Sequence, residues 1–290
     1  MQCVRLGLMW IQHWPGLIAS VFVLSVMAGT LGSLVGLGGG VILIPALTLG
    51  LGIDIRYAMG ASLISVIVTS SSAAAVTVRD QITNIRVALL LEVATTLGAL
   101  AGVGLSGLFS SSALHLVFSC LLLYSAAVMI RRGRNPPFRP LGRDVWADRL
   151  HLHSFFADGQ SGQLVHYEVS RVGLSWMLML GAGFASGLLG IGSGVLKVPA
   201  MDTAMGLPIQ VSAATSNFMM GVTAVTGALA YYQKGLIVPL LAAPVSLGVL
   251  LGSLVGTYLL KRLPAQVIRR IFVAILFVTA LQMAWKAVRA

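Results

Sequence analysis

Seven long apolar runs limit what this chain can fold into. They lie at residues 17–35, 57–78, 87–109, 112–130, 174–196, 237–260 and 271–284. Most of them reach the roughly 20 residues that an α-helix needs to cross a bilayer. Only 9% of the residues are charged, against roughly 25% in soluble domains, and the mean hydropathy is +0.94. Water cannot solvate such a chain, so we expect an all-α polytopic membrane protein.

The formal net charge of +11 fits membrane topology better than nucleic-acid binding. Positive side chains lie at the ends of apolar runs and between the two halves of the chain, not along one face of an element. Six arginines follow the fourth apolar run: Arg131, Arg132, Arg134, Arg139, Arg143 and Arg149. The positive-inside rule predicts that this region is cytoplasmic, and no nucleic-acid partner is expected.

We expect the N-terminal segment, residues 1–16, to lie at the membrane interface and to be retained. Four residues interrupt any hydrophobic region of signal-peptide type: Trp10, His13, Trp14 and Pro15. The two cysteines are far apart in sequence and define neither a disulfide framework nor a metal site. No cofactor is expected.

A glycine-rich motif occurs twice. The sequence Gly-Leu-Gly-Gly-Gly-Val-Ile-Leu-Ile-Pro-Ala at residues 36–46 returns as Gly-Ile-Gly-Ser-Gly-Val-Leu-Lys-Val-Pro-Ala at residues 190–200, 154 positions later. Further residues repeat at the same offset, among them Ser62 with Ser216. The pattern predicts two homologous transmembrane repeats, at residues 17–132 and 171–290, joined by a polar cytoplasmic connector at residues 133–170.

Each repeat contains a long apolar helix, the short glycine-rich segment and three further helices, which gives about eight to ten transmembrane segments. The repeats are inverted if the short segment spans the membrane and parallel if it re-enters. Counting positive residues does not decide between these topologies. Inversion does bring one tight cluster to the cytoplasmic side: Lys261, Arg262, Arg269 and Arg270. We therefore expect inverted repeats whose glycine-broken helices meet near the midplane.

The connector contains prolines, charges and three histidines, which is typical of a polar loop. We expect a short interfacial helix around residues 146–156. His151 and His153 are spaced to chelate a metal ion, but two histidines without a third ligand are more typical of a solvated loop. No metal site is predicted.

The two glycine-rich segments are the first candidates for a substrate site. Glycines permit the backbone to turn, and the following proline removes a donor, so backbone polar groups at membrane depth must line a cavity or face protein. A helix that restarts there directs N–H groups at the cavity, which suits an oxyanion. The alternative is close helix crossing alone, as we expect at Gly98 with Gly102 and at Gly252 with Gly256. The candidate substrate-binding residues are Gly36, Gly38, Gly39, Gly40, Pro45, Gly190, Gly192, Ser193, Gly194 and Pro199.

Lys197 distinguishes the second motif from the first, where Leu43 is the equivalent residue. Burying an unpaired lysine costs roughly 2.5–3.5 kcal/mol on insertion scales, so Lys197 should face a polar cavity, an anion or a carboxylate. It is a candidate both for substrate binding and for proton coupling; the alternative is snorkelling to an interface. The difference between the motifs predicts an asymmetric site with a positive bias.

A helix with several hydroxyl groups follows each motif. We place Ser62, Ser216 and Asn217 nearest the substrate, because they donate hydrogen bonds without a fixed charge. Such residues also hold membrane helices together, which is the alternative role. Glu92, inside an apolar run, is a second proton-coupling candidate, whereas Asp202 is weaker because it lies nearer the membrane edge.

The motif at residues 36–45, its counterpart at residues 190–199 and the spacing of the apolar runs resemble the TauE/SafE family of membrane permeases, which includes sulfite exporters. The resemblance covers nearly the whole chain except the connector. It implies export of a small sulfur-containing anion, such as sulfite, sulfoacetate or a related organosulfonate, across the cytoplasmic membrane and driven by the proton motive force. Ser193 in place of Gly39, Lys197 and the long connector depart from a symmetric pattern and leave the exact substrate open.

We expect a secondary transporter that works by alternating access, and we compare it with other functional classes. An anion channel of the same architecture is the nearest rival, and a metal-cation transporter would need more acidic and histidine residues within the spans. A membrane-embedded enzyme is disfavoured, because no His-Glu-x-x-His pair occurs and only His115 lies in a helix. The expected partners are a small anion and the lipid bilayer, and a homodimer is left open.

Overall fold

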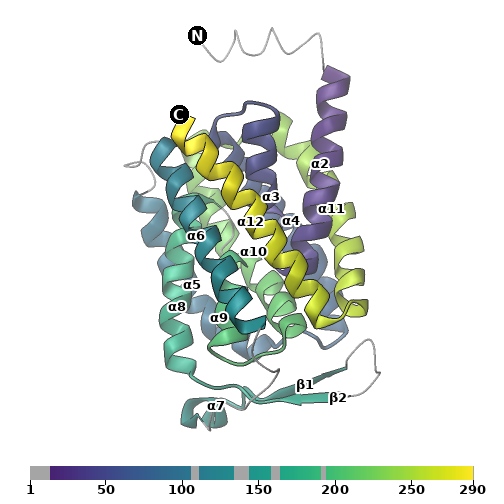
Figure 1. Ribbon diagram of the computed structural model, residues 1–290, viewed down its shortest axis with the longest axis vertical. Coiled ribbons are helices and arrows are strands. Elements are labelled where there is room, and N and C mark those ends of the chain that lie inside the picture. Colours follow the sequence, from purple (N-terminus) through teal and green to yellow (C-terminus); the bar gives the residue numbers. More distant parts are fainter. Residues whose placement is uncertain (1–13, 106–110, 134–143, 158–163, 191–193, 290) are drawn as a thin grey trace.

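A computed structural model describes residues 14–105, 111–133, 144–157, 164–190 and 194–289, and helices make up almost all of it (Figure 1). The helices of the first half are α2 (Trp14–Val35), α3 (Gly40–Pro45), the π-helix η1 (Ala46–Gly50), α4 (Ile55–Arg79), α5 (Ile85–Leu105) and α6 (Ser111–Gly133). Those of the second half are α8 (Val172–Leu189), α9 (Gly194–Thr203), α10 (Ile209–Gln233), α11 (Pro239–Arg262) and α12 (Ala265–Arg289).

Seven helices in the described part of the chain are long and apolar enough to cross a membrane: α2, α4, α5, α6, α8, α11 and α12. Helix α10 is as long as α4, but its polar residues lower its hydropathy, and most of them are buried. The expected all-α polytopic membrane protein is confirmed. The chain is a multi-pass protein of the cell membrane.

The helices of the two halves follow the same order, and several bounds differ by the offset of the repeated motif. Helices α4 and α10 have 25 residues each and begin at Ile55 and Ile209. In Figure 1, α2 begins at the end of the bundle opposite to the β-strands, whereas α8 begins beside the strands. The first helices of the two halves thus run in opposite directions. This arrangement favours inverted repeats, while the duplication itself stays a prediction.

Neighbouring helices come from opposite halves. Helix α2 packs along α11, α5 packs along α8, α4 crosses α10, and α6 pairs with α12. Glycines permit the close approach: a Cβ atom on Gly98 would lie 2.1 Å from the carbonyl oxygen of Leu180, and one on Gly252 would lie 2.1 Å from that of Val26. The two halves therefore interlock and share one core.

The connector differs from its prediction. The short helix expected around residues 146–156 is present but ends earlier: α7 covers Val145–Arg149, and β1 (Ser154–Ala157) pairs antiparallel with β2 (Leu164–Tyr167). Asp144 caps the start of α7 by accepting a hydrogen bond from the Trp146 N–H. The helix does not reach Phe155 and Phe156, which lie in β1. A short aromatic run of this kind suits a strand as well as a helix.

The connector is tied to the membrane helices. Asn84, which precedes α5, donates from Nδ2 to the carbonyl oxygen of Leu152 at 2.9 Å and to the Tyr167 hydroxyl at 3.1 Å. Burial raises the pKa of the Tyr167 phenol, because the charged form would lose its solvation. His153 contacts Asp148 at 2.8 Å, and the described residues contain no group of three or more histidine, cysteine, aspartate or glutamate side chains that could hold a metal ion.

Candidate functional site

The first helix break follows directly from its glycines. Helix α2 ends at Val35, and Gly36, Gly38 and Gly39 adopt positive φ angles of 75°, 71° and 74°. That conformation is unfavourable for a residue that carries a Cβ atom. The N–H groups after the break turn back on α2, since Leu37 and Gly38 both donate to the carbonyl oxygen of Gly32. The chain then restarts as α3.

The second break has a corresponding start. Gly190 takes a φ angle of 65° and donates its N–H to Ser186 at 2.8 Å, which ends α8. Helix α9 then begins at Gly194. Gly192 and Ser193, both predicted to bind substrate, lie outside the described residues.

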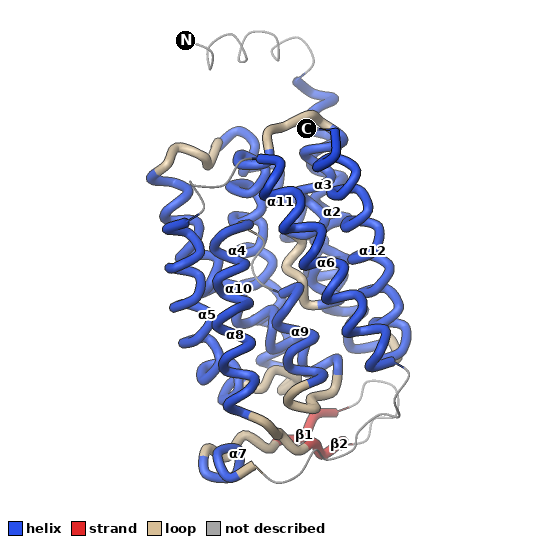
Figure 2. The backbone as a smooth tube through the Cα atoms, turned by 60° about the vertical axis from the view of Figure 1, so that its left-hand side comes forward, coloured by secondary structure: helices blue, strands red, loops and turns tan. Residues whose placement is uncertain are grey.

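Gly194, where α9 begins, lies against the first break, and α3 and α9 both lie inside the bundle (Figure 2). A Cβ atom on Gly194 would lie 2.4 Å from the carbonyl oxygen of Gly36 and 2.9 Å from the Leu37 Cα atom. A Cβ atom on Gly40 would lie 2.2 Å from the Ser62 hydroxyl. The glycines therefore serve close packing as well as turning.

Each break is held by a serine of the other half. Ser216 on α10 donates its hydroxyl to the carbonyl oxygen of Gly36 at 2.9 Å, and Ser62 on α4 donates to that of Gly190 at 3.0 Å. We call these two contacts the cross-half serine bonds. Both predicted serines therefore lie at the breaks, but each hydroxyl donates to a backbone carbonyl oxygen. A buried carbonyl that the helix break leaves open is thereby satisfied.

The two prolines have different local consequences. Pro45 is buried in α3, and the π-helix η1 begins at the next residue. A proline has no N–H to donate, so the regular α-helical ladder is interrupted at this point. Pro199 is also buried, but α9 continues past it to Thr203.

Lys197 is fully buried and forms an ion pair with Glu92. The distance from Lys197 Nζ to Glu92 Oε2 is 3.1 Å, and the ammonium also donates to the Thr223 hydroxyl at 2.7 Å. Thr223 in turn donates to Glu92 Oε1 at 2.6 Å. Helices α5, α9 and α10 thus contribute one side chain each to a closed triangle of hydrogen bonds.

Two further hydroxyls complete the coordination of the carboxylate. Thr95 donates to Glu92 Oε2 at 2.8 Å, and Thr96 donates to Oε1 at 3.3 Å. Of the three ligands that sequence alone suggested for Lys197, the structure places the carboxylate beside it. The pair carries no net charge, so Glu92 compensates the positive bias expected from Lys197. We call Lys197, Glu92 and Thr223 the buried ion-pair cluster.

Sequence reasoning named Lys197 and Glu92 separately and left the three threonines out of the site. Glu92 lies 105 positions before Lys197, and its counterpart in the repeat is Ser246, so the repeat pattern gave no sign of the pairing. The spacing of Glu92, Thr95 and Thr96 could have indicated that the threonines contact the carboxylate, because residues three and four apart share one face of a helix.

Asn217 lies beside the first break rather than at the buried ion-pair cluster. Its Nδ2 donates to the carbonyl oxygen of Ser33 at 2.8 Å, and its buried Oδ1 has no hydrogen-bond partner among the described residues. Asp202 accepts a hydrogen bond from Arg269 Nη2 at 3.0 Å. Asp202 is thus paired away from Lys197, which leaves Glu92 as the carboxylate of the cluster.

The comparisons with known proteins agree with this architecture. The family described as sulfite exporter TauE/SafE matches residues 21–283, and the chain belongs to this family. The probable membrane transporter protein YunE of Bacillus subtilis is 25% identical over 273 residues, which cover 92% of this chain and 97% of the relative. The probable membrane transporter protein YdhB of the same organism is 24% identical over 253 residues, covering 87% and 93% respectively. No solved structure matches the chain.

Proposed function

We propose that this protein, a membrane transporter of the sulfite exporter TauE/SafE family, exports a small sulfur-containing oxyanion by alternating access and couples the export to protons. The substrate class is sulfite, sulfoacetate or a related organosulfonate, and no catalytic chemistry is involved. The observation that carries this proposal is the buried ion-pair cluster beside the second helix break. A charged pair at that depth is costly, and such pairs in membrane helices mark ion pathways and proton relays.

Lys197 supplies the positive charge that an oxyanion needs. An ammonium group has three donors, and Glu92 and Thr223 each accept one of them. A sulfite or sulfonate group presents charged oxygens of the same hydrogen-bonding kind as a carboxylate. In our scheme the incoming anion therefore replaces Glu92 as the partner of Lys197, and the position of the ammonium group is unchanged.

Glu92 then binds the proton. Once the anion has taken its place, an ionised Glu92 would be an unpaired charge in a medium of low dielectric, which is strongly disfavoured. Proton uptake removes that charge, and the hydroxyl oxygens of Thr95 and Thr223 are within reach to accept a hydrogen bond from the protonated acid. Anion and proton consequently bind together and cross together, so in this scheme the membrane potential, acting on the remaining negative charge of the anion, drives export, while the inward pH gradient opposes it.

The helix breaks provide elements that can move between two arrangements. The cross-half serine bonds join the halves at the point where both backbones are irregular. Rocking of one half against the other around a fixed site is how many transporters with inverted repeats alternate access. Lys197 lies three residues after Gly194, so such a motion changes the surroundings of the buried ion-pair cluster directly.

Flux measurements with purified protein in proteoliposomes test the proposal. We expect saturable efflux of sulfite or sulfoacetate that is faster when the vesicle interior is more acidic, because proton and anion leave together. Flux that does not saturate and ignores the pH gradient would instead identify an anion channel. Transport of a divalent cation without any anion flux would overturn the anion assignment.

A matched pair of lysine variants assigns the site. Lys197→Ala should abolish anion binding in a direct binding measurement, whereas Lys261→Ala should leave it unchanged. Lys261 also pairs with a carboxylate, that of Asp80, but both side chains are about one-third exposed, at 30% and 33%. Unchanged binding in Lys197→Ala would show that this lysine is not the anion ligand.

A further inference from the structure

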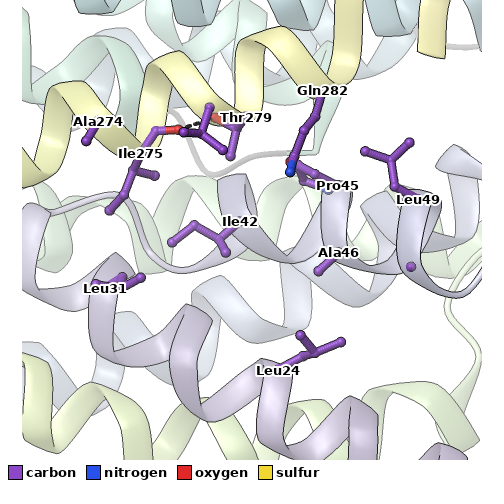
Figure 3. Close-up of a pocket in the computed structure, with 12 residues that line it drawn as sticks. Leu24, Leu31, Ile42, Pro45, Ala46, Leu49, Ala274, Ile275, Thr279 and Gln282 are labelled. Carbon is purple, nitrogen blue, oxygen red and sulfur yellow. Dashed lines mark hydrogen bonds between the residues drawn. The ribbon is translucent and has the colours of Figure 1, made fainter. Parts of the chain in front are cut away.

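An apolar groove opens between α2, α3 with η1, and α12 (Figure 3), and none of the residues that line it belongs to the buried ion-pair cluster. Its volume is about 680 Å³, within the roughly 300–1,000 Å³ typical of ligand pockets. Of the predicted substrate residues that the structure describes, only Pro45 lines it. The side chains that shape it include Leu24, Leu31, Ile42, Ala46, Ala274 and Ile275.

The groove faces the bilayer and reaches the first glycine motif. Ala274 and Val278 on α12 are exposed at its mouth, and α12 is one of the helices able to span a membrane. Ile42 and Pro45 on α3 form its inner wall. A hydrocarbon chain that enters from the bilayer therefore touches the short helix that follows the first break.

One end of the groove is polar and lies near the membrane surface. Gln282 is part of the lining, and Lys286, one turn further along α12, donates its ammonium to the carbonyl oxygen of Thr48 at 2.5 Å. Trp285 between them is 53% exposed, and exposed tryptophans in membrane helices gather at the level of the headgroups. An ammonium group has three donors, so the Thr48 carbonyl leaves donors of Lys286 for an anionic headgroup.

At the equivalent place beside α9, a side chain of α6 makes a direct contact. Ser125 on α6 donates to the carbonyl oxygen of Val195 on α9 at 2.5 Å, which holds these two helices together. Its counterpart Thr279 on α12 donates within its own helix, to Ile275 at 2.7 Å, and lines the groove instead. The groove thus opens where α12 of the second half meets α2 and α3 of the first, beside the first glycine motif.

We propose that this groove binds one acyl chain of an anionic bilayer phospholipid, whose phosphate contacts Lys286. The apolar walls match the chain, the open side is continuous with the lipid-facing surface of α12, and the positive end matches the charge of the headgroup. The occupant is a structural lipid that packs against α3, and its binding does not depend on which ion the protein transports.

Photo-crosslinking tests this site. The purified protein is reconstituted in phosphatidylethanolamine vesicles with phosphatidylglycerol that carries a diazirine in its acyl chain, and labelled peptides are mapped. Labelling should concentrate on residues 42–50 and 274–282. Ala274→Phe fills the mouth of the groove and displaces about two methylenes, which should lower the labelling of residues 42–50 roughly tenfold.

Two controls separate the site from ordinary lipid contact. Ala127→Phe makes the same change at an exposed alanine of α6 and should leave the labelling pattern unchanged. Lys286→Gln should reduce labelling by the phosphatidylglycerol probe to the level of a phosphatidylcholine probe. Labelling spread evenly over the lipid-facing helices, or unaffected by Ala274→Phe, would overturn the acyl-chain site. Equal labelling of the unmodified protein by the two probes would overturn the role of Lys286.

Discussion

Two equivalent regions of the molecule hold different chemistry, because the buried ion-pair cluster, with Glu92 from the first half and Lys197 and Thr223 from the second, corresponds to largely apolar surroundings at the matching positions. The matching residues are Lys197, Glu92 and Thr223 on one side and Leu43, Ser246 and Thr69 on the other. Leu43 packs in an apolar cluster with Val245 and Val249. The Ser246 hydroxyl donates to its own helix, and the Thr69 hydroxyl is buried without a hydrogen-bond partner among the described residues.

The backbone contacts of the two halves are alike where the side chains differ. Ser62 and Ser216 each bind the first glycine carbonyl of the opposite break, at 3.0 and 2.9 Å. The two breaks are therefore held by the same kind of contact, while among the described residues the buried ion pair forms at one of the two matching places.

The largest expected effect comes from removing one member of the ion pair. Lys197→Ala leaves Glu92 buried without its counter-ion and should destabilise the protein by about 3–5 kcal/mol, measured as the free energy of unfolding in mixed micelles. The double variant Lys197→Leu, Glu92→Ser copies Leu43 and Ser246, the residues at the equivalent positions, and should recover most of that loss while losing anion binding. A double variant as unstable as the single one would mean that the two regions are not equivalent.

The two equivalent threonines should respond in opposite ways. Thr223→Val removes hydrogen bonds to two charged groups and should cost about 1.5–3 kcal/mol. Thr69→Val removes a buried hydroxyl that has no partner among the described residues, so the free energy of unfolding should stay constant or rise. Similar losses in both variants would contradict the contrast between the two equivalent regions.

The cross-half serine bonds should show equal effects. Ser62→Ala and Ser216→Ala each leave a buried carbonyl oxygen unpaired, and each should cost about 1–3 kcal/mol. Thermal unfolding in detergent measures both under the same conditions. A loss of stability in only one of the two variants would contradict the equivalence of the two serine bonds.

Much of this fold could be predicted from the sequence, because the bilayer restricts the choice of structure. The seven apolar runs coincide with seven long helices, and the glycines of the first motif lie where α2 ends. The repeat offset also relates the bounds of α4 and α10. These features depend on local composition and on backbone conformations that glycine favours.

The partners of the polar side chains could not be predicted in the same way. Ser62 and Ser216 were expected to face a substrate, yet each donates to a backbone carbonyl more than a hundred residues away. Lys197 had three plausible partners, and only the packing of α5 against α9 and α10 selects Glu92. The hairpin of the connector depends on pairing between residues 154–157 and 164–167, which a local pattern does not specify.

The Glu92→Gln variant separates the proton from the anion most directly. Glutamine has nearly the size of a protonated glutamate and leaves Lys197 available for the anion. In proteoliposomes we expect anion flux that persists but no longer responds to an imposed pH gradient, while Ser246→Ala, the change at the equivalent position, keeps the normal response. Flux that remains fully dependent on the pH gradient in Glu92→Gln would contradict proton coupling at the buried ion-pair cluster.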